Sequence, residues 1–341
     1  MRLSINKVNA VARNLGLILL VVMSIYACSN TSSDDVGNAS EVDLGKISVS
    51  TTTNLIKDWV ENVGGDRVDV MSIIPHDSDP HTFKPTPKNM KDIEESSLFI
   101  LIGSQYEESW VQDAVSNTNQ RAIELSVEIW EELVAIADRE FGEHEDHDDH
   151  DKEHDDHAGH DHGDHGYDLH FWHDPTKVVS AIDVISNILV EMDPDNAEYF
   201  QSNATRYKQE LIDIDKWISS EVKNIPAEKR VLITNHRTMG YFAERYDFEI
   251  LGSVIPSFSS DEEPSPKDVA NILDIIEEHK VNVIFGELQM RDKLATAIAS
   301  DTGIRVATLH SETLGSEGSD TATYIDMIKV NVGIIVDNLS N

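Results

Sequence analysis

Short β-branched runs alternate with helix-spaced apolar residues in the first part of the chain. Within the segment 54–63, Leu55, Ile56, Trp59 and Val60 lie on one face of a helix. Strands that alternate with helices predict βα units and a parallel sheet, which gives one α/β lobe. The strands are expected at 46–53, 68–75, 98–103 and 121–125, and the helices at 54–63 and 87–97.

The same alternation returns in the last third of the chain and predicts a second α/β lobe. Its clearest helix covers 267–280, where Val269, Ile272, Leu273 and Ile276 share one face. The strands of this lobe are expected at 231–235, 248–254, 281–285 and 306–309, and its helices at 241–246, 267–280, 292–299 and 324–339.

Between the two lobes, apolar residues recur at steps of three and four through 197–223, without Pro or Gly. This pattern predicts a helix of about 27 residues, which would be about 40 Å long. We expect this linking helix, assigned to 196–224, to join an N-terminal lobe at 46–195 to a C-terminal lobe at 225–341. An ordinary long surface helix is the alternative.

The N-terminus is typical of an export signal. Three basic residues precede an apolar stretch at 15–27, which is too short to span the roughly 30 Å of a bilayer core but suits a signal peptide. The small residue Ala27 before Cys28 resembles a bacterial lipobox, so we expect cleavage of 1–27, lipid attachment at Cys28 and a flexible tether over 28–45. This predicts an extracytoplasmic protein anchored to a lipid bilayer. The alternative is an ordinary cleaved signal that leaves Cys28 as an incidental thiol.

Composition narrows the classes of ligand. The 341 residues include 63 Asp and Glu against 27 Lys and Arg, so the formal charge is −36. Such a surface repels phosphate, which argues against a nucleic-acid partner and favours a cationic ligand. With one cysteine in the chain, neither an internal disulfide nor a metal centre built from several cysteines is possible.

A low-complexity segment over 143–168 combines carboxylates with eight histidines and has almost no apolar side chains. We interpret it as a mobile loop that binds divalent metal with low selectivity, because imidazoles among carboxylates offer many ligand arrangements. A solvated charged insertion is the alternative. The histidines are His144, His147, His150, His154, His157, His160, His162 and His165.

Three histidines outside this loop stand in unusual settings. His81 follows the strand expected at 68–75, and His170 closes the charged loop just before a helix. His236 lies at the C-terminal end of the strand 231–235, where open α/β sheets place their ligand sites. Each alone could be a structural, hydrogen-bonded histidine, and for His236 by itself that is the favoured interpretation. Together they predict a cleft in which imidazoles from both lobes meet.

Four motifs carry a resemblance to a known family. They are Asp-Pro-His-Thr-Phe-x-Pro-Thr-Pro at 79–87, Asp-x-His-Phe-Trp-x-Asp-Pro at 168–175, Asn-His at 235–236 and Glu-Pro-Ser-Pro at 263–266. Over about residues 46–341, the chain resembles the metal-specific solute-binding proteins of ABC transporters, the zinc and manganese receptors of cluster A-I. The resemblance implies two α/β lobes joined by one rigid helix, a metal in the interlobe cleft, and a membrane permease as partner.

The resemblance also implies the metal ligands. Three histidine ligands fall on His81, His170 and His236, and the fourth ligand, usually Asp in the family, falls on Glu312. His173 is interpreted as a residue that supports the site or belongs to the loop, with direct ligation as the alternative. Glu287 is a reserve carboxylate that is more simply structural.

Three neutral imidazoles and one carboxylate suit tetrahedral Zn²⁺, whereas more carboxylates would favour Mn²⁺. The expected function is therefore high-affinity capture of Zn²⁺ by a monomer and its delivery to an ABC permease, with a manganese receptor of the same family as the alternative. A lipid-tethered adhesin or zinc buffer that uses only the loop is also open. Three histidines and a water also form a catalytic zinc shell. However, the chain contains no His-Glu-x-x-His or Gly-x-Ser-x-Gly motif, so we do not expect an enzyme.

Overall fold

The computed structural model describes residues 45–76, 78–104, 106–117, 121–129, 133, 168–288 and 293–340. The expected signal peptide, Cys28, most of the tether and the eight loop histidines lie outside the described residues. The chain divides into Met1–Gly45 and Lys46–Asn341, and the second unit holds the fold. No helix in the described part of the chain has the length and apolar character needed to cross a membrane.

The described residues of the first lobe form a four-stranded parallel sheet in the order β2-β1-β3-β4. Thr53 caps the first helix by accepting a hydrogen bond from the backbone of Ile56, and that helix buries Trp59, whose ring contacts Phe171 and Tyr324. The strands are β1 (Ile47–Thr51), β2 (Val68–Ser72), β3 (Leu98–Leu101) and β4 (Arg121–Glu124), and the helices are α2 (Asn54–Gly64), α3 (Pro87–Glu95), α4 (Trp110–Asn117) and α5 (Leu125–Glu128).

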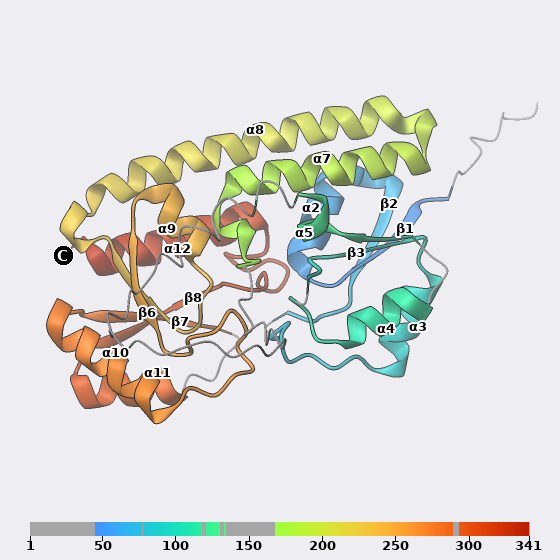
Figure 1. Ribbon diagram of the computed structural model, residues 1–341. Coiled ribbons are helices and arrows are strands. Elements are labelled where there is room, and N and C mark those ends of the chain that lie inside the picture. The colour runs from blue at the N-terminus through green and yellow to red at the C-terminus, as the bar shows by residue number, and fades with distance from the viewer. Residues whose placement is uncertain are drawn as a thin grey trace, which may run out of the picture. The chain divides into compact units, whose positions relative to one another are not determined.

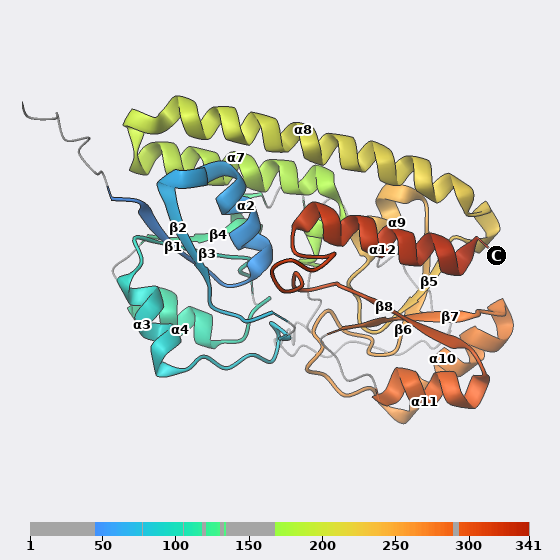
Figure 2. The same cartoon turned by 180° about the vertical axis from the view of Figure 1, so that it is seen from behind.

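The described residues of the second lobe form another four-stranded parallel sheet, in the order β6-β5-β7-β8. Figures 1 and 2 show helices on both faces of this sheet, with α10 and α11 on the side opposite α9 and α12. The strands are β5 (Val231–Thr234), β6 (Glu249–Ser253), β7 (Val283–Glu287) and β8 (Arg305–Leu309), and the helices are α9 (Gly240–Tyr246), α10 (Pro266–His279), α11 (Lys293–Thr302) and α12 (Tyr324–Leu339).

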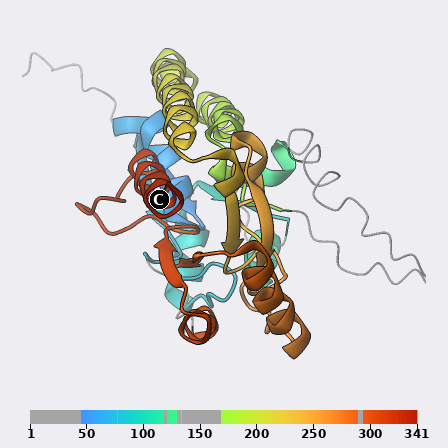
Figure 3. The same cartoon turned by 90° about the vertical axis from the view of Figure 1, so that its left-hand side faces the viewer.

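One long helix, α8 (Ala197–Glu221), runs along both lobes beside α7 (Pro175–Met192) (Figures 1 and 2). Figure 3 shows α8 from its end, with α7 and α12 beside it. Tyr207 of α8 donates a hydrogen bond to Asp58 in the first lobe at 3.0 Å, and Asp215 of α8 binds Arg245 in the second lobe at 2.8 Å. The helix therefore contacts both lobes, which confirms the predicted linking helix and excludes an ordinary surface helix.

The hydrophobic core is continuous from one lobe to the other. A single cluster of buried side chains includes Trp59 in the first lobe, Leu211 of α8 and Phe285 in the second lobe. Because close-packed interiors resist deformation, this shared core opposes a wide hinge motion between the lobes.

The predicted α/β class and parallel sheets are confirmed, but some boundaries differ. The strand expected at 281–285 is β7 (Val283–Glu287), which begins and ends two residues later and has Glu287 as its last residue. The sequence did not predict α4, because this helix has only 8 residues, and a run of about two turns is too short to establish a helical period.

Candidate metal site

His81 lies on the loop that follows β2, in a turn set by its neighbours. The backbone N–H of His81 donates to the carboxylate of Asp79 at 2.9 Å, and Pro80 restricts the chain between them. The Nδ1 atom of His81 lies 2.8 Å from the backbone carbonyl of Tyr106. Since a carbonyl accepts only, Nδ1 carries the proton and Nε2 is left as the basic nitrogen.

His170 is held by a carboxylate two residues before it. Asp168 Oδ1 accepts from both the backbone N–H and Nδ1 of His170, at 2.9 and 2.8 Å. The short helical turn Phe171–His173 and then α7 follow directly, so the imidazole is fixed at the start of a rigid element. As in His81, Nδ1 faces the orienting partner, here Asp168, so Nε2 points away from that partner.

His236 comes directly after Thr234 and Asn235 at the carboxyl end of β5. Its backbone carbonyl accepts from the Thr234 hydroxyl at 2.7 Å, and its Nδ1 donates to Glu287 Oε1 at 2.6 Å. Because β5 and β7 are parallel neighbours, their carboxyl ends bring these two residues together. The reserve carboxylate at Glu287 therefore orients a histidine.

Glu312 lies on the segment after β8. The hydroxyl of Tyr106 donates to Glu312 Oε2 at 2.6 Å, across the two lobes. The indole N–H of Trp172 donates to the carbonyl of Ser311 at 2.7 Å, and Asn54 accepts from the backbone N–H of Leu314 at 2.8 Å. These bonds fix the carboxylate segment on both sides.

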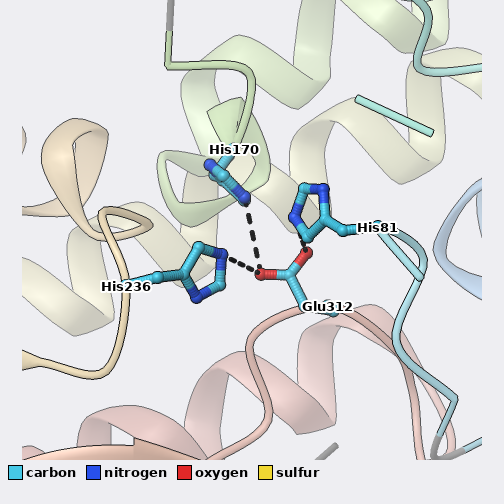
Figure 4. Close-up of side chains that lie close together, drawn as sticks. All are labelled: His81, His170, His236 and Glu312. Atoms are coloured by element: carbon cyan, nitrogen blue, oxygen red, sulfur yellow. Dashed lines mark ion pairs between the residues drawn. The ribbon is translucent and has the colours of Figure 1, made fainter. Parts of the chain in front are cut away.

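The four side chains meet at one point between the lobes, as Figure 4 shows. His81, His170, His236 and Glu312 each offer one ligand atom, and these atoms all lie within 4.8 Å of one another. Each side chain is at most 5% exposed. Among the described residues, none provides a hydrogen bond to the three Nε2 atoms or to Glu312 Oε1. Buried polar atoms without partners are costly, so a set of four facing each other indicates a site for a ligand.

The distances fit a metal ion. Glu312 Oε1 lies 3.5 Å from Nε2 of His170 and 3.6 Å from Nε2 of His236, and Oε2 lies 4.0 Å from Nε2 of His81. Ligands about 2.0–2.1 Å from a tetrahedral zinc are roughly 3.3 Å apart, so the two Oε1 distances are close to those of such a shell. Ligand atoms that lie up to 4.8 Å apart must move together to complete it.

Burial and charge set the protonation of the cluster. Burial lowers the pKa of His81 to about 4 and that of His170 well below its usual value, so both imidazoles are neutral at pH 7. Burial also lowers the pKa of His236, but the charge and hydrogen bond of Glu287 outweigh this effect and raise the pKa to about 9. Burial raises the pKa of Glu312 to about 8. A metal ion must therefore displace protons from His236 and Glu312.

The remaining candidate, His173, falls outside the four-residue group found among the described residues. It is buried, and burial lowers its pKa to about 4. The sequence did not identify Tyr106 or Asp168 as parts of the site. The position of Asp168 two residues before His170 was a usable signal, whereas nothing local marks Tyr106, which contacts Glu312 from 206 positions away.

The sequence matches a known protein family. A model of the family described as zinc-uptake complex component A, periplasmic (ZnuA), matches residues 49–338. The chain belongs to this family. As a ZnuA-family protein, it is a metal-binding receptor of a zinc or manganese ABC uptake system, and not an enzyme.

Some relatives of this ZnuA-family protein are named for zinc and others for manganese. The high-affinity zinc uptake system protein ZnuA of Bacillus subtilis is 31% identical, over 95% of this chain and 97% of its own. The manganese-binding lipoprotein MntA of Halalkalibacterium halodurans is 29% identical, again over 95% and 97%. The periplasmic zinc-binding protein TroA of Treponema pallidum shares the fold, with a TM-score of 0.74 at 23% identity, over 87% of this chain and all of its own.

Proposed function

We propose that the protein captures Zn²⁺ outside the cytoplasm and delivers it to the permease of an ABC transporter. One observation carries this proposal: His81, His170 and His236 direct three Nε2 atoms, and Glu312 one carboxylate oxygen, at the same buried point. We assign these four residues as the zinc ligands.

The donor set favours zinc over manganese on chemical grounds. For a given nitrogen and oxygen shell, affinity rises from Mn²⁺ towards Cu²⁺, and Zn²⁺ lies well above Mn²⁺. Three imidazoles and one carboxylate also match the tetrahedral shell of Zn²⁺, whereas Mn²⁺ favours about six oxygen-rich contacts. The names of the relatives divide between the two metals, so the shell itself is the argument for zinc.

The orienting contacts support tight binding. The protonated Nδ1 atoms of the three histidines face the carbonyl of Tyr106 and the carboxylates of Asp168 and Glu287. Such contacts fix the orientation of each ring before the metal arrives, leave Nε2 as the nitrogen that faces the metal, and make that nitrogen more basic. A prearranged shell binds more tightly because little order is lost on binding.

The location and anchor are part of the proposal. The family description is periplasmic, and MntA is named a lipoprotein, in agreement with a signal peptide at 1–27 and a lipid at Cys28. We further propose that the histidines between 143 and 168 hold additional, weaker metal sites, and that the protein acts as a monomer with lobes at 46–195 and 225–341 joined through 196–224.

The test is metal competition in protein lacking residues 143–166, so that the loop histidines do not contribute. Purified, chelator-treated protein is offered Zn²⁺ and Mn²⁺ together, and the bound metals are measured by mass spectrometry. We expect one bound ion per chain and a preference for Zn²⁺ of orders of magnitude. Equal retention of Mn²⁺ would reject zinc and support a manganese receptor. Loss of all tight binding would instead support a buffer or adhesin that uses only the loop.

A further inference from the structure

The two oxygens of Glu312 face different partners. Oε1 lies 3.5 Å from Nε2 of His170 and 3.6 Å from Nε2 of His236, whereas Oε2 accepts the Tyr106 hydroxyl at 2.6 Å. Oε2 is also 4.0 Å from Nε2 of His81, so it is close enough to the same point to act as a second ligand if the hydroxyl were removed. Tyr106 therefore controls how many oxygens the carboxylate can offer.

The turn that presents Tyr106 is fixed by buried hydrogen bonds. Gly103 and Ser104 both have positive φ, 88° and 51°, which is a strained conformation for Ser104. The buried carboxylate of Glu107 stabilises the turn by accepting from the backbone N–H groups of Ile102 and Gly103, at 2.9 and 3.0 Å, and from the hydroxyl of Thr52 at 2.6 Å. Strained backbone persists only where its surroundings hold it, and the backbone N–H of Tyr106 donates to the carbonyl of Gly103 at 3.0 Å, so Tyr106 is anchored to this backbone.

The Tyr106 ring is also enclosed by the site. Its centroid lies 4.8 Å from that of His81, 5.6 Å from that of His170 and 5.3 Å from that of Trp172, in edge-to-face arrangements. The side chain is 3% exposed. The hydroxyl has little freedom to leave Glu312, because both the backbone and the ring are held.

We propose that Tyr106 is a specificity-determining residue, whose hydroxyl occupies Oε2 of Glu312 so that the carboxylate gives the metal one oxygen. The inference rests on the proposed zinc function and adds the residue that keeps the shell at four ligands. Four ligands satisfy Zn²⁺, whereas a bidentate carboxylate would give five and move the site towards the larger shell that Mn²⁺ favours.

The test compares Tyr106→Phe with the unsubstituted protein, both without residues 143–166. Phenylalanine keeps the ring and the backbone carbonyl that orients His81, and removes only the hydroxyl. We expect the ratio of Zn²⁺ to Mn²⁺ affinity to fall about tenfold, in line with the strength of one hydrogen bond to a charged group. With Co²⁺ as the probe, we expect the intense visible bands of a four-coordinate ion to weaken as a fifth ligand enters.

A matched control is Tyr246→Phe. Its hydroxyl donates to Asp215 at 3.0 Å, away from the cluster, so this variant also loses a buried tyrosine hydrogen bond. We expect the metal ratio and the Co²⁺ spectrum of Tyr246→Phe to match those of the unsubstituted protein. A shift equal to that of Tyr106→Phe would assign the effect to general loosening and overturn the proposal.

A double substitution separates the remaining outcomes. If Tyr106 acts through the carboxylate, Tyr106→Phe has no further effect on the metal ratio in a Glu312→Ala background. An undiminished effect in that background would overturn the proposal. If the unsubstituted protein prefers Zn²⁺ but Tyr106→Phe changes neither ratio nor spectrum, this inference fails and the zinc function stands. If the unsubstituted protein has no preference, the zinc function itself fails.

Discussion

Replacement of Glu287 by Gln tests how the protein controls the proton on His236. Glu287 is 5% exposed, and its two oxygens accept from His236 Nδ1 at 2.6 Å and from the Ser311 hydroxyl at 2.8 Å. Glutamine has the same length and keeps an acceptor oxygen, but it removes the negative charge. The substitution therefore separates orientation of the imidazole from its electrostatic stabilisation.

The magnitude follows from the pKa of His236, which is about 9. Zinc binds the deprotonated Nε2, so at pH 7 proton competition lowers the apparent affinity about a hundredfold relative to its limit above the pKa. Without the charge of Glu287, burial lowers the pKa of His236, and this competition disappears. A charged partner that makes the ligating nitrogen more basic is also worth about 10–100-fold in metal affinity. Above about pH 9 we expect Glu287→Gln to bind zinc about 10–100-fold more weakly than the unsubstituted protein. Below about pH 9 this difference in affinity should shrink about tenfold per pH unit, because only the unsubstituted protein loses affinity to the proton on His236.

The assay is competition with a chromophoric zinc chelator from about pH 6 to about pH 10, in protein lacking residues 143–166. Ser311→Ala is the matched control, because it removes one hydrogen bond to Glu287 and leaves the carboxylate in place. We expect its affinity to rise with pH as steeply as that of the unsubstituted protein. Parallel curves for Glu287→Gln and the unsubstituted protein would show that Glu287 does not control this proton.

Three further predictions concern the ligands, the loop and the fold. Replacement by Ala of His81, His170 or His236 should weaken zinc binding, measured by calorimetry, by more than about a hundredfold, which is more than the loss of an orienting residue causes. If a variant titrates like the unsubstituted protein, the histidine that it lacks is not a ligand. Deletion of 143–166 should remove the weaker sites from the isotherm and keep the tight one, and loss of the tight site would reverse this assignment. Burial raises the pKa of Asp58 to about 6, so the folded state binds its proton more tightly than the unfolded state does, and stability falls as pH rises from about 4 to about 6. Asp58→Asn should remove this fall, which amounts to roughly 3 kcal/mol, in urea unfolding of chelator-treated protein; an unchanged pH profile would contradict it.

The sequence alone was sufficient for the α/β class, the order of the main elements and the long linking helix. These features depend on local periodicity, as in α8, where buried residues such as Phe200, Leu211 and Ile218 recur on one face. The sequence also singled out His81, His170 and His236, because each stands in a short motif beside a strand end or a helix start. Short-range patterns of this kind are visible in a linear chain.

Only the tertiary structure decided how these residues work together. Tyr106 reaches Glu312 across 206 positions, and His236 reaches Glu287 across 51, so no local pattern links the partners. Their contacts arise because parallel strands of each sheet end on the same side, and because a shared core holds the two sheets against α8. Packing therefore determines which nitrogen of each histidine carries the proton, which oxygen of Glu312 faces the imidazoles, and how far burial and charge shift each pKa.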